Sequence, residues 1–136
     1  MDLKGKTFIV TGGGSGLGAG TAQVFVDAGA NVIVADVAVD QGAKTAGELG
    51  DNARFVECNV VSEEQVQQAV DTARDQFGGL HGAINCAGIA AAQRVLTKGG
   101  PHPLDLFKAV LDVNLSGSFN VIRLAAAAMV GLDPDE

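Results

Sequence analysis

A glycine-rich segment, VTGGGSGLG, begins at Val10 and separates an apolar, β-branched run from an amphipathic stretch. Between a strand and a helix, such a loop offers free backbone N–H groups and the positive end of the helix dipole to a phosphate. Gly12 can turn the chain tightly, Gly16 can let a pyrophosphate approach, and Gly18 can let the helix pack close to the sheet. The segment predicts a dinucleotide site whose loop residues are Gly12, Ser15, Gly16, Leu17 and Gly18.

Two other interpretations of this loop were compared with the dinucleotide site. A P-loop measured from Gly13 requires Lys and then Ser or Thr after Gly18, where Ala19 and Gly20 stand, so that motif is excluded. Glycine spacing alone fits several registers and is weak, whereas the position of the loop carries more weight. A tight turn that binds nothing remains the alternative.

A carboxylate, Asp36, ends the next strand-like run, NVIVAD, about 20 residues after the loop. At that place it can accept a hydrogen bond from a ribose 2′-hydroxyl and repel a 2′-phosphate. No Lys or Arg lies between Gly12 and Gly18 or beside Asp36. The prediction is NAD in preference to NADP, and the alternative is a solvated Asp at the end of a strand.

Apolar runs alternate with helical patterns along the whole chain. Strands are expected over residues 7–12, 31–36, 53–60 and 81–88, and helices after the loop to Gly29, on to about Gly50, from Ser62 to Gly78, and from about Leu104. Parallel strands require helical crossovers, so this order predicts an α/β fold with a doubly wound parallel sheet, a Rossmann fold, in one domain over residues 1–136.

The last two helices carry the clearest local signals. Ser62 and Gln65 form a capping box at the start of the third helix, and Gly78 ends it. Residues 89–103 are rich in Gly and Pro and are expected to be a loop. The helix from Leu104 is apolar nearly all round, which predicts that a larger body or a partner subunit covers it.

Composition excludes several classes of function. The net charge of −7 argues against a nucleic-acid partner. No apolar run approaches ~18 residues, and the start lacks a signal peptide, so we expect no membrane span and a cytoplasmic location. Cys58 and Cys86 show no metal-binding spacing and are expected as free thiols, and no metal site is predicted.

Three motifs together resemble the short-chain dehydrogenases and reductases. TGGGSGLG is similar to the Thr-Gly-x-x-x-Gly-x-Gly signature of that family, NCAG (Asn85 to Gly88) resembles its Asn-Asn-Ala-Gly motif, and Asn114 matches its helix asparagine. The stretch from NCAGIAAA through the last helix looks closer still to the type 2 3-hydroxyacyl-CoA dehydrogenases, which also oxidise some hydroxysteroids. The match extends along the whole chain.

The resemblance implies a role for each matching residue. It makes the three loop glycines pyrophosphate contacts, Asp36 the adenine-ribose contact and Asn114 a catalytic residue that holds a helix distortion and a water of the proton relay. It also implies cofactor contacts at Asn59, Val60, Asn85, Ala87 and Gly88. Cys86, which replaces the second Asn of the motif, is expected to pack, and His81 and His102 match no catalytic position.

In the family, a Ser and a Tyr-x-x-x-Lys pair follow this long helix, and this chain has no tyrosine. The resemblance therefore implies the N-terminal half of an NAD-dependent oxidoreductase, inactive by itself. The complete protein would oxidise a secondary alcohol to a ketone, on a 3-hydroxyacyl-CoA or hydroxysteroid, as a homodimer or homotetramer. The alternatives are a non-catalytic dinucleotide-binding or regulatory module and an interaction protein that uses the apolar last helix.

Overall fold

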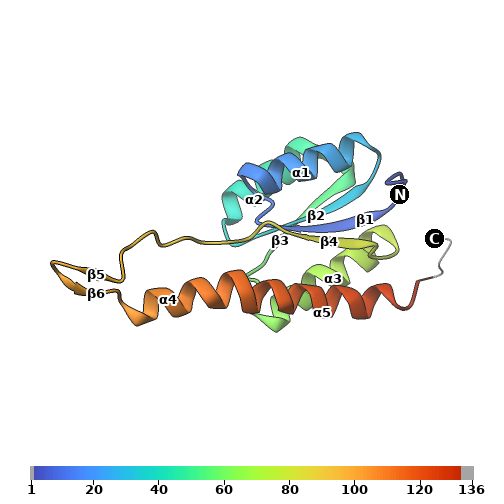
Figure 1. Cartoon of the computed structure of the whole chain (residues 1–136). Helices are drawn as coiled ribbons and strands as arrows, with labels where there is room; N and C mark the ends of the chain where they lie inside the picture. Colours follow the sequence, from blue (N-terminus) through green and yellow to red (C-terminus); the bar gives the residue numbers. More distant parts are fainter. Residues whose placement is uncertain (1, 133–136) are drawn as a thin grey trace.

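A four-stranded parallel sheet lies at the centre of the computed structural model, which describes residues 2–132 (Figure 1). The strands are β1 (Thr7–Thr11), β2 (Asn31–Asp36), β3 (Ala53–Glu57) and β4 (Gly82–Asn85), in the spatial order β3-β2-β1-β4. The predicted parallel sheet is confirmed. Met1 and residues 133–136 of the predicted domain lie outside the described residues.

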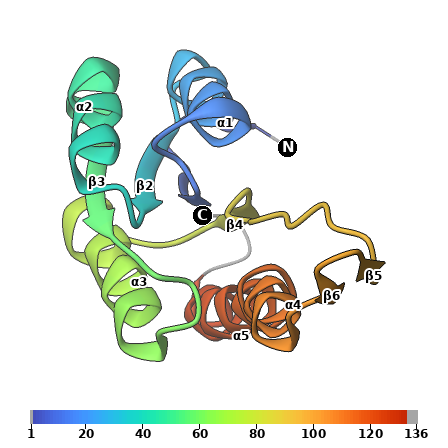
Figure 2. The ribbon, with the colours of Figure 1, turned by 90° about the vertical axis from the view of Figure 1, so that its left-hand side faces the viewer.

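Helices cover both faces of this sheet, as Figure 2 shows. On one face lie α1 (Gly16–Asp27) and α2 (Val39–Leu49), and a short 3-10 helix (Gly50–Asn52) follows α2. On the other lie α3 (Glu63–Phe77) and α5 (Ser118–Met129), which continues from α4 (Leu104–Leu111) through a π-helical turn (Asp112–Gly117). The doubly wound arrangement of the prediction is therefore present.

Two apolar clusters, one on each face of the sheet, hold these layers together. Alternate residues of a strand point to opposite faces, so Val32 and Val34 pack under α1 and α2, while Ile33 packs under α3 and α5. All three side chains are fully buried. Burial on both faces explains why NVIVA shows no polar alternation.

The start of α3 differs in one detail from the predicted capping box. Ser62 Oγ accepts a hydrogen bond from Gln65 N at 3.3 Å, as expected. Gln65 Oε1, however, accepts from the amide of Asn59 at 2.6 Å and not from that of Ser62, which donates to the Asn59 carbonyl. The box therefore ties α3 to the segment that follows β3. Gly78, with φ +85°, ends the helix as predicted.

The third and fourth strands are shorter than predicted. After Glu57, the chain leaves the sheet, and only the amide of Cys58 still reaches a β2 carbonyl, that of Asp36. After Asn85, the amides of Cys86 and Ala87 donate to the side-chain oxygen of Thr11, the last residue of β1, and not to a backbone carbonyl of that strand. The last residues of both predicted strands are thus free to line a cavity.

The prediction of a loop over residues 89–103 is wrong in part, because four of these residues form short strands. A small antiparallel hairpin forms there from β5 (Leu96–Thr97) and β6 (Gly100–Pro101). Thr97 Oγ1 accepts from the Gly99 amide at 3.2 Å, and Gly100 adopts φ +115°, which its missing Cβ permits. This hairpin and α4 project from the body of the molecule (Figure 1).

The long helix exposes much of its apolar surface. Phe107, Leu115 and Phe119 are 53%, 66% and 65% exposed, and α4 has no buried residue. α5 reaches the core through Val121 and Ala125, and Val113 of the π-helical turn packs against the same cluster. The inference that a larger body or a partner covers this helix stays a prediction. Within residues 2–132, no helix has the length and apolar character needed to cross a membrane.

Candidate functional site

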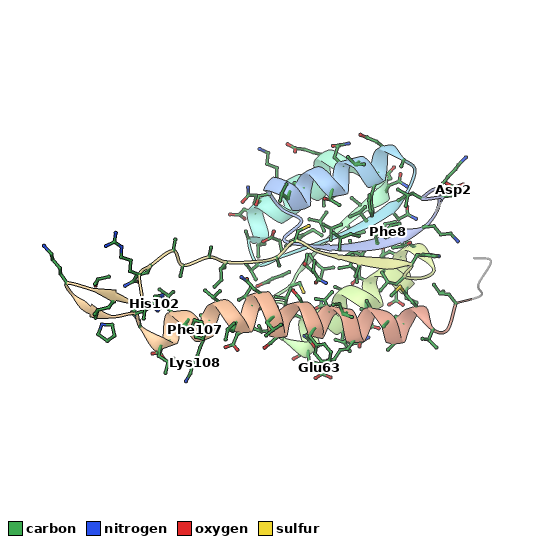
Figure 3. All side chains as sticks on the ribbon, in the orientation of Figure 1. Asp2, Phe8, Glu63, His102, Phe107 and Lys108 are labelled. Carbon is green, nitrogen blue, oxygen red and sulfur yellow. The ribbon has the colours of Figure 1, made fainter. Side chains whose placement is uncertain are left out.

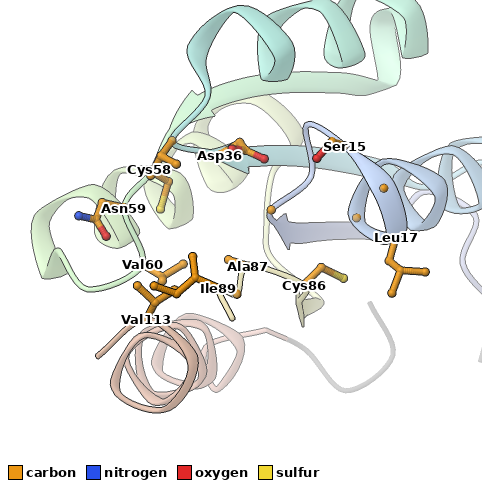
Figure 4. A pocket seen from close by; sticks show the side chains of 15 residues that line it. Ser15, Leu17, Asp36, Cys58, Asn59, Val60, Cys86, Ala87, Ile89 and Val113 are labelled. Carbon is orange, nitrogen blue, oxygen red and sulfur yellow. The ribbon is translucent and has the colours of Figure 1, made fainter. Parts of the chain in front are cut away.

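A cavity of about 420 Å³ lies where the carboxyl ends of the strands meet the first turn of α1 (Figure 4). Ligands of open α/β sheets bind in this place, at the point where the strand order reverses. The residues that line it are Gly12, Ser15, Gly16, Leu17, Gly18, Asp36, Val37, Cys58, Asn59, Val60, Cys86, Ala87, Gly88, Ile89 and Val113. The cavity thus gathers the predicted cofactor contacts with the exception of Asn85.

The glycine loop brings the backbone at Gly12 close to that of Ala87, after β4, and to that of Gly18, in α1. Gly12 has φ +61°, and a Cβ on it would lie 2.9 Å from the backbone N and Cα of Ala87. A Cβ on Gly18 would overlap the Gly12 carbonyl, so α1 can start this close to β1 only with glycine there. Space is open at Gly16. The loop is therefore packed on the side of the sheet and open on the side of the cavity.

The first turn of α1 presents unpaired donors to the cavity. The first amides of a helix have no intrahelical acceptor, and the side chain of Ser15, the N-cap residue, forms no capping hydrogen bond. Leu17 is 87% exposed, while Gly18 and Ala22 are the buried residues of α1. Free amides together with the positive end of the helix dipole suit a phosphate group.

Asp36 ties the end of β2 to the glycine loop. Its Oδ2 accepts from the Gly14 amide and its Oδ1 from the Ala38 amide, each at 2.9 Å. Thr45 Oγ1 donates to the Gly14 carbonyl at 2.9 Å and fixes the same turn from α2. A carboxylate accepts about four hydrogen bonds, so Asp36 retains capacity for a ligand. None of the residues that line the cavity is Lys or Arg.

The segment after β3 forms the next wall. Cys58 is buried, and this burial, with a smaller effect of the Asp36 carboxylate, raises the pKa of its thiol from 9.0 to about 11. The thiol is therefore protonated and unreactive near neutral pH. Asn59 is exposed at the cavity, and its Oδ1 accepts from the Val61 amide at 3.2 Å. A local turn thus uses part of the hydrogen-bond acceptor capacity of the Asn59 side chain, which was predicted as a cofactor contact.

Thr11 organises the end of β4, a role that sequence reasoning missed. Its buried Oγ1 accepts from the amides of Cys86 and Ala87, each at 3.2 Å, and its hydroxyl lies 3.5 Å from the Ile84 carbonyl. Cys86 therefore turns toward the cavity, while the exposed Asn85 does not line it. The sequence does place a residue with a side-chain hydroxyl, Thr11, directly before Gly12, and this could have indicated a hydrogen-bonding role.

Asn114 lies in the π-helical turn and holds the chain after β4. Its Oδ1 accepts from the Ile89 amide at 2.9 Å, and its Nδ2 donates to the Ile89 carbonyl at 2.8 Å. Ser118 Oγ donates to the Asn114 carbonyl at 2.7 Å. Asn114 itself does not line the cavity, but its neighbour Val113 and its partner Ile89 do. The helix distortion expected at this residue is present.

The two histidines do not line this cavity. His81 Nδ1 accepts from the Thr7 amide at 3.0 Å at the start of β1, which is a structural role. His102 lies beside the hairpin, with Nδ1 2.9 Å from the Pro103 carbonyl. Both cysteines are free thiols. Within residues 2–132, no group of three or more His, Cys, Asp or Glu side chains could hold a metal ion.

Comparison with known proteins gives consistent matches. Residues 6–134 match the family described as short chain dehydrogenase. The 3-hydroxyacyl-CoA dehydrogenase type-2 of Homo sapiens is 45% identical over 98% of this chain and 52% of its own length. The 2,5-dichloro-2,5-cyclohexadiene-1,4-diol dehydrogenase of Sphingobium indicum is 39% identical over 95% of this chain and 50% of its own length.

A solved structure agrees with these matches. The crystal structure of 3-hydroxyacyl-CoA dehydrogenase type-2 from Mycobacterium avium superposes with a TM-score of 0.88 at 38% identity. The superposition covers 96% of this chain and 51% of that one. The chain thus spans about half the length of the relatives it matches.

Proposed function

Because this chain belongs to the short-chain dehydrogenase family, we propose that it forms the cofactor-binding half of an NAD-dependent oxidoreductase. The complete protein oxidises a secondary alcohol to a ketone, and its substrate class is 3-hydroxyacyl-CoA. The observation that carries the proposal is the cavity that the glycine loop, Asp36 and Ile89 line together. Bound NAD would supply the hydride acceptor for the reaction.

The residues of the cavity fit this cofactor. Free amides at the first turn of α1 suit a pyrophosphate, and open space at Gly16 lets it approach. Asp36 lies at the end of β2, where a ribose 2′-hydroxyl can donate to its remaining lone pairs. No cation of the cavity wall could neutralise a 2′-phosphate. The chemistry of these donors and acceptors favours NAD over NADP.

Two observations support an acyl-CoA substrate. The relatives with 45% and 38% identity are named 3-hydroxyacyl-CoA dehydrogenase type-2. The arm formed by residues 94–111, which contains the hairpin and α4, also carries three cations, Arg94, Lys98 and Lys108, against one carboxylate, Asp105, in a chain whose net charge is −7. None of these cations forms an ion pair within residues 2–132. The phosphates of coenzyme A are the part of such a substrate that a cationic arm would attract.

This arm, on which Figure 3 labels His102, Phe107 and Lys108, projects away from the sheet.

Asn114 is the one predicted catalytic residue within this chain. Within the proposal, Asn114 acts on the cavity through Ile89, whose backbone it fixes. Its side-chain oxygen and nitrogen are both engaged there. We infer that it holds this wall and supports the proton relay of the complete protein through the carbonyls and waters around the π-helical turn.

The test uses the complete protein with NAD and two forms of one substrate. A 3-hydroxyacyl-CoA and the corresponding N-acetylcysteamine thioester share the reacting alcohol. The N-acetylcysteamine compound, called the short thioester below, lacks the phosphates of coenzyme A. We expect turnover of both, with the lower KM for the CoA ester. In Arg94→Gln/Lys98→Gln, the KM for the CoA ester rises several-fold, because the long-range attraction between these cations and the CoA phosphates is lost. The KM for the short thioester does not change.

The matched control is Lys4→Gln/Lys44→Gln, which removes the same charge from positions remote from the arm. It leaves both KM values unchanged. Turnover of a sugar alcohol or a hydroxysteroid without any acyl-CoA would refute the substrate class. NAD binding without turnover of any alcohol would favour the non-catalytic module.

A further inference from the structure

A buried side chain of α5 reaches across to the wall of the cavity from behind. Asn120 is only 8% exposed, and its Nδ2 donates to the Val60 carbonyl at 2.9 Å. Val60 lines the cavity next to Asn59, whereas Asn120 does not. The hydrogen bond joins residues 60 positions apart in the sequence. It is the kind of buried contact whose loss leaves a carbonyl without a partner.

The orientation of the Asn120 amide is fixed by its other neighbour. Arg123 donates to Asn120 Oδ1 through Nε at 3.1 Å and through Nη2 at 2.8 Å. A guanidinium group can only donate, so the amide oxygen must face Arg123 and the amide NH₂ must face Val60. Arg123 is held in turn by Glu63, at 2.8 Å from Nη2.

These contacts close a circuit around the segment between β3 and α3. Glu63 belongs to the first turn of α3, three residues after Val60, and Figure 3 shows it beneath the long helix. From Glu63 the circuit runs to Arg123, then to Asn120, and returns to Val60. The segment 60–63 is therefore clamped at both ends by one helical turn of α5.

The side chain of Val60 is fixed by the same helix. A Cβ on Gly117 would overlap Val60 Cγ2, so glycine alone lets the start of α5 approach this closely. Val60 is 5% exposed and belongs to the core cluster under α3 and α5. Backbone and side chain of Val60 thus both depend on α5, and little freedom remains for this wall to move.

We propose that Asn120 is a positioning residue for the adenosine half of the dinucleotide. The inference rests on the proposed binding of NAD. Asn59 and Val60 lie on the side of the cavity that Asp36 and Val37 also line, at the end of β2, where an adenine ribose binds. Ile89, held by Asn114, follows β4, which lies at the opposite edge of the sheet from β3. Loss of the hydrogen bond from Asn120 therefore weakens binding of the adenosine half of the dinucleotide and leaves binding of the nicotinamide half unchanged.

The experiment measures the two halves of the ligand separately. ADP-ribose and nicotinamide mononucleotide are titrated calorimetrically into the complete protein, wild type and Asn120→Ala. We expect the Kd for ADP-ribose to rise about fivefold to tenfold, the size of effect for an unsatisfied buried carbonyl. The Kd for nicotinamide mononucleotide stays within about twofold. A general loss of structure would raise both Kd values.

Two further variants separate positioning from folding. Val121→Ala truncates a neighbouring core side chain of α5 that has no polar atom to donate to the Val60 carbonyl, so it lowers Tm and leaves both Kd values unchanged. Arg123→Gln alters a partly exposed residue and keeps the fold, and it raises the Kd for ADP-ribose less than Asn120→Ala does. This graded order is the expected result.

The outcomes also separate this inference from the proposed function. If the wild-type protein binds neither ADP-ribose nor NAD, the proposed function fails and the inference fails with it. If the wild type binds both and Asn120→Ala leaves the Kd for ADP-ribose unchanged, the positioning role alone is overturned. Equal losses for the two half-ligands in Asn120→Ala would overturn it as well.

Discussion

Asn114 and Ile89 are joined by two hydrogen bonds, in which the Asn114 amide acts once as acceptor and once as donor toward the Ile89 backbone. The side chain thus replaces a strand neighbour for a residue that has left the sheet. Six residues later, Asn120 gives the same kind of support to the Val60 carbonyl. One helix therefore supports two walls of the candidate cofactor cavity, and mutations in it affect different parts of the site.

Replacement of Asn114 should affect turnover more than cofactor affinity. Asn114→Ala leaves the amide and the carbonyl of Ile89 without these partners. Because both bonds are exposed to water, each lost bond costs about 0.5–1.5 kcal/mol. We expect kcat of the complete protein to fall roughly tenfold or more and the Kd for ADP-ribose to stay near the wild-type value. Ser116→Ala, in the same π-helical turn, is the control and should retain kcat. Equal kcat values for the two variants would contradict this role.

Asp36 should determine the choice between NAD and NADP. Asp36→Ala removes both an acceptor for a ribose hydroxyl and the charge that repels a 2′-phosphate. We expect the Kd for NAD to rise about tenfold, as for a lost hydrogen bond to a charged group, and the Kd for NADP to fall. Fluorescence titration of both reduced cofactors is the measurement. Asp40→Ala, in the first turn of α2, is the control, and a wild type that prefers NADP refutes the assignment.

Two glycines of α1 should respond in opposite ways to the same substitution. A Cβ on Gly18 would overlap the Gly12 carbonyl, whereas a Cβ on Gly20 would meet open space. Gly18→Ala should lower the free energy of unfolding by about 1–3 kcal/mol through overpacking and weaken cofactor binding. Gly20→Ala should raise it by up to about 1 kcal/mol through helix propensity. Urea unfolding of both variants provides the comparison, and a stable Gly18→Ala protein would be inconsistent with the packing.

Cys58 should make the folded state less stable in alkali. Its pKa is raised from 9.0 in the unfolded chain to about 11 in the folded one, chiefly by burial and then by Asp36. The folded state binds this proton more tightly, so its contribution is complete below pH 9.0 and is lost as the pH rises toward about 11. The loss is on the order of 2 kcal/mol.

Urea unfolding between pH 8 and pH 11 measures this effect. In Cys58→Ala, the fall in the free energy of unfolding across this range should be smaller than in the wild type. Val56→Ala truncates another buried residue of the same core cluster and has no titratable group, so it should keep the wild-type slope. Parallel curves for Cys58→Ala and the wild type would show that the thiol is not responsible.

Residues 1–136 alone should be catalytically inert and prone to association. In the strand order β3-β2-β1-β4, β4 has an unpaired outer edge, which invites pairing with other chains. Phe107, Leu115 and Phe119 also leave an exposed apolar face on the long helix. Light scattering after size exclusion, together with NADH production, tests both points. A monodisperse monomer that turns over an alcohol would show that no further residues are needed.

Much of the fold could be predicted from the sequence, because its signals are local. β2 occupies the predicted residues 31–36, and Gly29 and Gly78 end their helices with φ +82° and +85°. Each signal depends on a few neighbouring residues, such as a β-branched run or a residue that tolerates a left-handed conformation. The place of Asp36 at the end of β2 follows from the same local pattern.

The remaining features depend on contacts between distant segments. Thr11 meets the amides of Cys86 and Ala87, 75 and 76 residues further on, and this pairing shortens the fourth strand. No local pattern distinguishes these amides from those of a strand. The turn of Cys86 into the cavity in place of Asn85 and the clamp of Asn120 on Val60 have the same origin. Such pairs become visible only when the layers are packed.

The π-helical turn Asp112–Gly117 determines how the side chains of α5 are rotated about the helix axis relative to those of α4. A π-turn accommodates one more residue than an α-helical turn, and each residue of an α-helix advances the side chains by about 100°. Deletion of one residue there would make the hydrogen bonding regular, yet it would rotate α5 relative to α4 by about that angle. Asn114 and Asn120 could then no longer face Ile89 and Val60 together. The extra residue acts as an angular spacer, so insertions and deletions should be tolerated far less here than in the β5–β6 hairpin.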